Sequence, residues 1–137
     1  MKKASKFILL GEDDIDDQEI LEEVFAKVDP TCELQFFNNG TKVVSHIENT
    51  SDNLPCLIVL DFNMPELNGA EILKIIGKDE RLKEIPKIIW STSGSPVFKT
   101  MCLELGACDY LVKPSTINGL EDIVKHMLNY CSAQSAQ

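Results

Sequence analysis

Short apolar segments alternate with longer segments of helical periodicity along the whole chain, and this alternation restricts the possible fold more than any other feature. Phe7–Leu10, Leu57–Leu60 and Ile88–Trp90 are continuously apolar. Strands have this pattern when both of their faces are buried, as in a parallel sheet covered by helices. The strands expected on this basis are Lys6–Gly11, Glu33–Phe37, Cys56–Leu60, Lys87–Ser91 and Asp109–Val112.

The segments between these strands repeat apolar residues at helical spacing. The first helix is expected to start at Asp14-x-x-Asp17, with Asp14 as its cap, and Asn68-x-x-Glu71 is a capping box for the third. The fourth is expected to end at Gly106. Five strand–helix units predict an α/β fold, a doubly wound parallel sheet flanked by five helices. Ligands of such sheets bind beyond the carboxyl ends of the strands.

The length of 137 residues suits a single domain spanning 1–137, with a core of about 5–130 and a frayed tail at 132–137. No apolar run approaches the roughly 18 residues of a membrane span. The apolar run at 7–10 is too short for the core of a secretion signal. A cytoplasmic protein without a membrane partner is therefore expected.

Charge and cysteine content narrow the possible partners. The net charge of −9 disfavours binding to nucleic acid or to an anionic membrane and is compatible with a cation site. The five cysteines include no C-x-x-C pair, which predicts reduced thiols rather than a disulfide framework or a zinc site.

Polar residues collect where four of the predicted strands end. They are Glu12, Asp13 and Asp14 after the first strand, Asp61 after the third, Ser91, Thr92 and Ser93 at the fourth, and Lys113 after the fifth. Converging carboxylates repel one another without a cation, and hard oxygen ligands suit Mg²⁺. A lysine and a hydroxyl alongside fit a phosphoryl group that is transferred to a carboxylate oxygen.

These segments resemble the receiver domains of bacterial two-component response regulators, over about residues 5 to 130. The segments that carry the resemblance are Ile8–Asp14, Leu57–Gly69, Ile85–Ser91 and Gly106–Pro114. The resemblance implies a flavodoxin-like sheet of strand order 2-1-3-4-5, as in the single-domain chemotaxis regulators, and a cis peptide before Pro114.

The resemblance also assigns roles to residues. Asp61 is the implied phosphoacceptor, and Lys113 is expected to bind a phosphoryl oxygen. The Mg²⁺ ligands, with Mn²⁺ as an alternative ion, are expected to be Asp13, Glu12 (partly through water), Asp61 and the backbone carbonyl of Asn63. Ser91 is expected to move to the phosphoryl group, and Tyr110 either to rotate inward with it or to pack at the domain edge. Asn63 and Ser93 are expected to set the lifetime of the phosphorylated state.

The sequence departs from the family pattern at several positions. Gly11 replaces an aliphatic residue, which predicts a more flexible end of the first strand. Ser91 replaces the commoner threonine, and the bulky Trp90 precedes it with no indication of the face on which it packs. The long lead-in Asp79–Pro86 resembles the small subgroup that includes partners of bacterial phytochrome kinases.

The expected function is that of a stand-alone phosphoacceptor switch, which catalyses only its own phosphorylation and dephosphorylation. Its donor is a sensor histidine kinase or a histidine phosphotransfer protein. No output domain is expected after residue 131, so the face of the fourth helix, fifth strand and fifth helix is expected to bind a separate protein target or a second copy.

Three alternatives remain open at this point. A flavin carrier would need a phosphate loop where Glu12-Asp13-Asp14 stands, and an aspartyl phosphatase would need a carboxylate where Asn63 stands. The third is a module that binds partners on a receiver fold without phosphorylation.

Overall fold

The computed structural model describes residues 7–51 and 53–135, with side chains described through residue 131. The strands are β1 (Phe7–Gly11), β2 (Glu33–Phe37), β3 (Leu57–Asp61), β4 (Lys87–Ser91) and β5 (Asp109–Val112). The helices are α1 (Ile15–Val28), α2 (Gly40–Asn49), α3 (Gly69–Ile76), the 3-10 turn η1 (Glu80–Leu82), α4 (Pro96–Glu104) and α5 (Ile117–Ser135).

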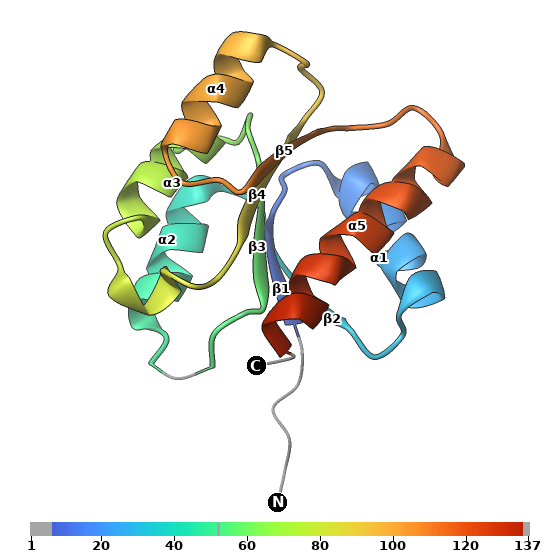
Figure 1. The fold of residues 1–137 in the computed structure, drawn as a ribbon, viewed down its shortest axis with the longest axis horizontal. Helices are drawn as coiled ribbons and strands as arrows, with labels where there is room; N and C mark the ends of the chain where they lie inside the picture. Colours follow the sequence, from blue (N-terminus) through green and yellow to red (C-terminus); the bar gives the residue numbers. More distant parts are fainter. Residues whose placement is uncertain (1–6, 52, 136–137) are drawn as a thin grey trace, which may run out of the picture.

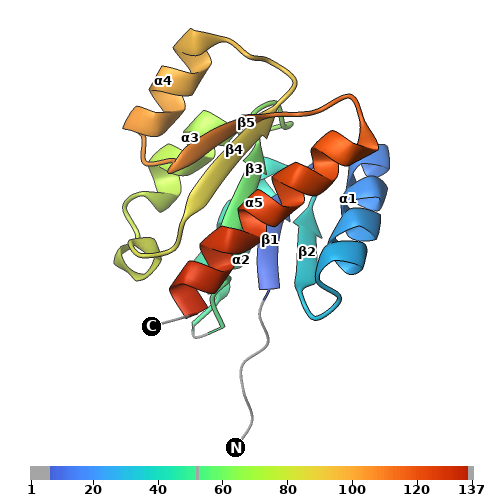
Figure 2. The ribbon, with the colours of Figure 1, turned by 45° about the vertical axis from the view of Figure 1, so that its right-hand side comes forward.

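Within the described residues the strands form one parallel sheet of order β2-β1-β3-β4-β5, which confirms the predicted flavodoxin-like fold. Helices α1 and α5 cover one face, and α2, α3 and α4 cover the other (Figures 1 and 2). The chain leaves β1 toward the face that α1 covers and leaves β3 toward the face that α3 covers, so the switch point of the topology lies at the carboxyl ends of β1 and β3.

The continuously apolar strands are buried on both faces, as their sequence predicts. Leu9, Ile58 and Ile89 pack into the core beneath α2, α3 and α4. Their neighbours Ile8 and Val59 point the opposite way, into the core beneath α1 and α5. Two cores on either side of one sheet explain why no polar residue interrupts these strands.

The predicted helix starts are confirmed in their hydrogen bonds. The Asp14 side chain accepts from the backbone N–H of Asp17 at the start of α1. Asn68 and Glu71 form the reciprocal capping box of α3. These caps satisfy N–H groups that the first helical turn leaves without a partner, and they fix where each chain segment leaves the edge of the sheet.

The lead-in to β4 is held by a buried lysine. Lys87, the first residue of β4, donates to the backbone carbonyls of Leu82 and Ile85 at 2.6 and 2.9 Å. Leu82 and Ile85 themselves pack in the core beneath α2, α3 and α4. The segment from 79 to 86 is therefore an ordered turn that is anchored to the sheet.

The prediction of reduced thiols is wrong for two of the five cysteines. Cys56 and Cys131 form a disulfide, with a Cα–Cα distance of 5.1 Å and a sequence separation of 75. Cys56 directly precedes β3, and α5 runs back along the sheet so that its last turns reach the amino ends of the strands (Figure 1). The pairing depends on this long-range return of the chain, which local spacing does not indicate.

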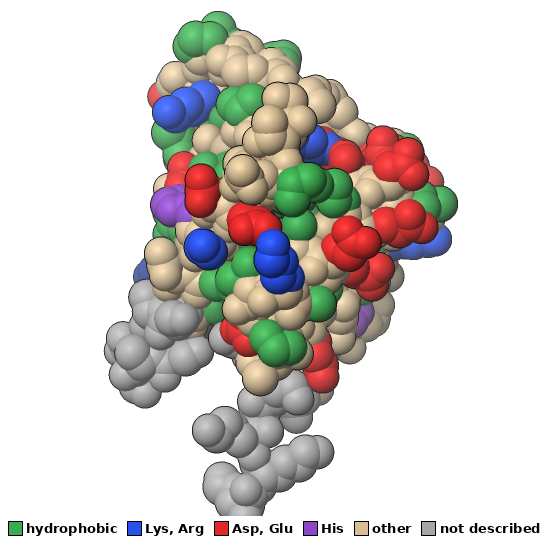
Figure 3. All heavy atoms as spheres, turned by 90° about the vertical axis from the view of Figure 1, so that its right-hand side faces the viewer, with side chains coloured by type: hydrophobic (Ala, Val, Ile, Leu, Met, Phe, Trp, Pro, Cys, Tyr) green, Lys and Arg blue, Asp and Glu red, His purple; other side chains and the backbone are tan. Residues whose placement is uncertain are grey.

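Acidic side chains gather on the face that carries α1 and α5 (Figure 3). The exposed acidic residues of α1 are Asp16, Glu19, Glu22 and Glu23.

Within the described part of the chain no helix is long and apolar enough to cross a membrane. The backbone of 132–135 continues α5, while residues 136 and 137 lie outside the described residues, so the frayed tail stays a prediction.

Candidate functional site

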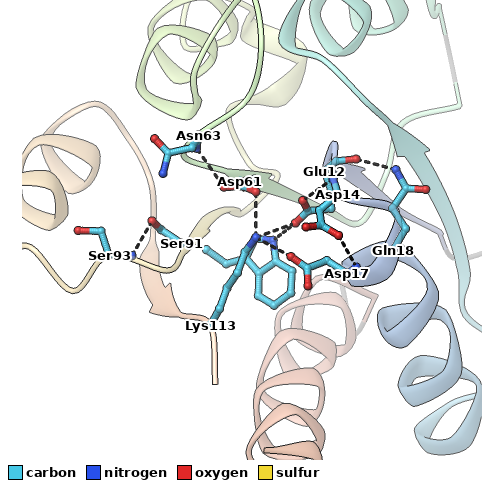
Figure 4. A network of polar contacts seen from close by, with 10 residues as sticks. Glu12, Asp14, Asp17, Gln18, Asp61, Asn63, Ser91, Ser93 and Lys113 are labelled. Atoms are coloured by element: carbon cyan, nitrogen blue, oxygen red, sulfur yellow. Dashed lines mark hydrogen bonds and ion pairs between the residues drawn. The ribbon is translucent and has the colours of Figure 1, made fainter. Parts of the chain in front are cut away.

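Four strand ends meet at one edge of the sheet because all strands run in the same direction. Asp61 is the last residue of β3 and Ser91 the last of β4, while Glu12 follows β1 and Lys113 follows β5. Figure 4 shows Lys113 directed at Asp61, Glu12 and Asp17. The residues that the sequence placed at this edge are thus brought together, with Asp17 added from α1.

Three carboxylates form a cluster that could hold a metal ion. Oxygens of Glu12, Asp13 and Asp61 all lie within 4.8 Å of one another. Glu12 and Asp61 are buried and Asp13 is exposed, so the cluster opens to solvent on one side. Carboxylate oxygens with room for water are the donor set that hard divalent cations prefer. The residues present therefore fit such an ion.

The ammonium group of Lys113 is shared among three carboxylates. Its Nζ donates to Asp61 Oδ2 and to Asp17 Oδ2 at 2.9 Å each, and to Glu12 Oε1 at 3.1 Å. Burial opposes the charged ammonium, but the hydrogen bonds to Asp61 and Asp17 and the charge of Glu12 outweigh it and raise the pKa of Lys113. The lysine is a fixed positive charge beside Asp61.

The Glu12 side chain is fully buried and is held by several donors. Its Oε2 accepts from the backbone N–H of Asp14 at 3.0 Å, and its Oε1 accepts from Trp90 Nε1 at 3.1 Å. Burial, and secondly the charge of Asp61, raise the pKa of Glu12 to about 7. A buried carboxyl group with a raised pKa beside a second carboxylate is a common property of functional centres.

Asp61 presents its two oxygens to different partners. Oδ1 accepts from the backbone N–H of Asn63 at 3.0 Å, and Oδ2 accepts from Lys113. Asn63 itself is exposed and borders the carboxylate. The β3–α3 loop thus fixes the orientation of Asp61 through its backbone and leaves the Asn63 side chain next to the site.

Ser91 and Tyr110 are linked through Ser93. The buried Ser91 Oγ accepts from the backbone N–H of Ser93 at 3.0 Å (Figure 4). The Tyr110 hydroxyl donates to the backbone carbonyl of Ser93 at 2.8 Å. The Tyr110 ring is 6% exposed and packs in the core beneath α2, α3 and α4. Both side chains therefore contact one backbone unit of the β4–α4 loop.

Two local expectations from the resemblance are corrected. Gly11 is buried between β2 and β3, and a Cβ there would lie 2.7 Å from Met64 Cε, so glycine makes room for Met64 rather than loosening the strand. Every peptide bond within residues 7–51 and 53–135 is trans, including the one before Pro114.

Asp17 and the role of Trp90 were missed in the sequence. Asp17 was interpreted only as part of a helix start, and no spacing rule connects it to Lys113, which lies 96 residues away. Trp90 lies on the face that α1 and α5 cover. A buried indole needs an acceptor for its N–H, which was a signal that Trp90 faced a polar group.

Comparison with known proteins agrees with this geometry. Residues 8–125 match the response regulator receiver domain family. The two-component response regulator ARR17 of Arabidopsis thaliana is 28% identical over 131 residues, which cover 89% of this chain and 84% of the relative. Two further response regulators of that plant are longer, and the chain spans 62% and 64% of their lengths. The chain belongs to the response regulator receiver domain family, whose members are signalling switches.

Solved structures show the same fold over nearly the whole chain. The phosphorylated cyanobacterial phytochrome response regulator RcpA has a TM-score of 0.84 and 27% identity, and the comparison covers 96% of each chain. The Mn²⁺-bound form of response regulator Rcp1 has a TM-score of 0.78 and 29% identity, covering 88% of this chain and 90% of that one.

Proposed function

We propose that this protein is a phosphoacceptor switch in which Asp61 receives a phosphoryl group from a phosphohistidine in a Mg²⁺-dependent reaction. The observation that carries the proposal is the contact of 2.9 Å between Lys113 Nζ and Asp61 Oδ2, inside a cluster of three carboxylates. A buried carboxylate with a fixed ammonium beside it is suited to nucleophilic attack on phosphorus, where charge develops on the phosphoryl oxygens.

In the proposed transfer, an oxygen of Asp61 forms a bond to phosphorus while the bond between phosphorus and the donor histidine nitrogen breaks. The nitrogen keeps the electron pair of that bond. Lys113 binds one phosphoryl oxygen, and this contact replaces part of its present hydrogen bonding to carboxylates. Hydrolysis of the resulting acyl phosphate restores Asp61.

Asp13, Glu12, Asp61 and the backbone carbonyl of Asn63 are the proposed ligands of Mg²⁺, and Mn²⁺ is the alternative ion. When bound, the ion neutralises charge on the phosphoryl oxygens. The cluster of Glu12, Asp13 and Asp61 supports this assignment, because one ammonium group, that of Lys113, does not balance the charge of three carboxylates.

Ser91 and Tyr110 are the proposed switch residues. In the structure Ser91 Oγ accepts from the Ser93 N–H, which leaves its own O–H as the donor for a phosphoryl oxygen. Movement of Ser91 toward the phosphoryl group would therefore act on Ser93, to whose backbone carbonyl the Tyr110 hydroxyl donates. The face of α4, β5 and α5 is the proposed surface for a downstream protein or a second copy of the chain.

Asn63 and Ser93 are proposed to tune the lifetime of the acyl phosphate. The Asn63 side chain is exposed beside Asp61, and Ser93 lies in the loop after Ser91. Asn63→Ala and Ser93→Ala should therefore change the rate of dephosphorylation. Unchanged rates in both variants would remove this part of the proposal.

The proposed donor is a sensor histidine kinase or a histidine phosphotransfer protein. Similarity to the cyanobacterial phytochrome response regulator RcpA supports a kinase of the phytochrome class. Light-dependent phosphate transfer from such a kinase to Asp61, absent with a matched non-phytochrome kinase, would support it. Equal transfer from both kinases would remove the phytochrome assignment.

The net charge of −9 supports protein partners rather than nucleic acid or a membrane.

The decisive test is incubation with Mg²⁺ and acetyl phosphate, followed by intact-mass analysis of the wild type and of Asp61→Asn. One phosphate-sized mass gain that requires Mg²⁺ and is lost in the variant is expected. No gain, and no binding of beryllofluoride as a stable acyl phosphate mimic, would reject the proposal in favour of a module that binds partners without phosphorylation.

A further inference from the structure

Trp90 is the sole tryptophan of the sequence and directly precedes Ser91 in β4. It is the fourth residue of β4, opposite Asp61 of β3 and Leu111 of β5 in the strand register. Its side chain is 2% exposed and packs on the side of the sheet that α1 and α5 cover. A large aromatic residue thus lies beneath the strand ends that carry Asp61 and Lys113.

The indole N–H of Trp90 has an ionisable partner. Trp90 Nε1 donates to Glu12 Oε1 at 3.1 Å, across 78 residues of sequence. The same Oε1 accepts from Lys113 Nζ at 3.1 Å, while Oε2 accepts from the backbone N–H of Asp14. With donors on both oxygens, rotation of the Glu12 carboxylate is restricted to one orientation.

The face of the indole ring supports Lys113. The Lys113 Nζ lies 4.7 Å from the centre of the ring, within the range of a cation–π contact. Trp90 and Lys113 also line a small cavity of about 150 Å³ between the starts of α1 and α5. The Lys113 ammonium therefore contacts carboxylates and the face of the indole ring at the same time, which limits the orientations of the Lys113 side chain.

We propose that Trp90 is a positioning residue of the phosphoacceptor site, which aligns Glu12 through its indole N–H and Lys113 through its ring face. The inference rests on the proposed function and assigns to β4 a role in addition to that of Ser91. A core residue that only filled volume would need neither the N–H nor the aromatic face. The two contacts are separable by substitution, so each can be tested alone.

Trp90→Phe removes the N–H and keeps an aromatic ring, whereas Trp90→Leu removes both. Phe25→Leu is the matched control, because Phe25 is 1% exposed in the same core and contributes no polar atom to the site. Mn²⁺ affinity is measured by calorimetry, and phosphate uptake from acetyl phosphate by intact mass. Circular dichroism checks that each variant is folded.

Loss of a hydrogen bond that orients a metal ligand typically lowers affinity by about 10- to 100-fold. We expect Trp90→Phe to weaken Mn²⁺ binding by roughly 10-fold, and Trp90→Leu also to slow phosphate uptake. Phe25→Leu should change neither by more than about 2-fold, since it removes no contact of the site. Wild-type Mn²⁺ affinity in folded Trp90→Phe would overturn the inference.

A spectroscopic test needs neither metal nor phosphate. The single indole N–H gives one resolved signal in a ¹H–¹⁵N spectrum, and in metal-free protein this signal should shift in Glu12→Gln and in Lys113→Met. An unmoved signal in both variants would show that Trp90 does not hold these side chains. If the wild type takes up no phosphate, the proposed function fails, whereas the indole signal still decides the role of Trp90.

Discussion

Lys113 donates to Asp17 of α1 at 2.9 Å, the same distance at which it donates to Asp61. The Asp17 side chain is 33% exposed and that of Asp61 is 7% exposed, so the lysine joins a solvent-facing carboxylate to a buried one. An incoming phosphoryl group must compete with Asp17 for this ammonium. Under the proposed function, Asp17 would oppose phosphorylation in two ways, by occupying Lys113 and by repelling an anion.

Asp17→Asn should accelerate phosphate uptake by Asp61. Exposed ion pairs contribute about 0.2–1 kcal/mol, which sets an expected increase of about 1.5- to 5-fold in the rate with acetyl phosphate. Glu19→Gln is the control, because it removes one exposed charge from the same helix and Glu19 is not among the carboxylates that bind Lys113. A rate for Asp17→Asn equal to that of Glu19→Gln, measured by intact mass over time, would contradict this account.

The fold was predictable because its signals are local. A continuously apolar strand such as Leu57–Leu60 indicates two covered faces, and the capping box at Asn68 and Glu71 indicates where a helix starts. Residues at strand ends were predictable as well, since parallel strands bring their carboxyl ends to one edge. These two rules together place Asp61 and Lys113 at one edge of the sheet, and the resemblance to receiver domains added the expectation that both meet a phosphoryl group.

The remaining parts of the site depend on contacts between distant segments. Trp90 reaches Glu12 across 78 residues and Lys113 reaches Asp17 across 96, and neither distance follows from periodicity. The contact of Met64 with Gly11 depends on the path of the loop between β3 and α3. Side-chain placement of this kind follows from packing of the finished fold, which a single sequence does not encode in local patterns.

The disulfide between Cys56 and Cys131 should stabilise the folded chain measurably. It ties the last part of α5 to the start of β3, and disulfides commonly contribute about 2–4 kcal/mol by restricting the unfolded chain. The free energy of unfolding in urea should fall by this amount in Cys56→Ala. Reductant should produce the same loss in the wild type and none in Cys56→Ala, whereas a wild type that is insensitive to reductant would exclude the bond.

Gly11→Ala tests the packing of Met64 against Gly11, because the added Cβ would lie 2.7 Å from Met64 Cε and 3.1 Å from its Sδ, the far end of a flexible side chain that must then shift. Because the flexible end of Met64 can move aside, the cost should lie at the low end of the about 1–3 kcal/mol of overpacking and be largely offset by the roughly 0.5–1 kcal/mol that replacing glycine in a strand returns. In a Met64→Ala background the clash is absent, so the same substitution should become neutral or stabilising. A double-mutant cycle in urea measures the difference, and equal effects in both backgrounds would contradict the packing argument.

Asp109 at the start of β5 should contribute to stability against acid. Its Oδ2 lies 2.7 Å from His126 Nε2 and accepts from the Tyr130 hydroxyl at 3.1 Å, while Oδ1 accepts from the backbone N–H of Tyr110. Burial raises the pKa of Asp109, but these hydrogen bonds outweigh it, led by that of His126, and the net effect lowers the pKa. The carboxylate thus ties β5, and with it Tyr110, to α5.

A carboxyl group whose pKa is lower in the folded state than in the unfolded state binds fewer protons when folded. Its stabilisation is therefore present above the unfolded pKa of about 3.9 and is lost as the pH falls through the lower, folded value. The free energy of unfolding should fall between pH 5.5 and pH 3 by more in the wild type than in Asp109→Asn. Glu84→Gln, which removes one charge from an exposed side chain, should keep the wild-type slope. If Asp109→Asn also keeps that slope, Asp109 does not hold β5 to α5 through its charge.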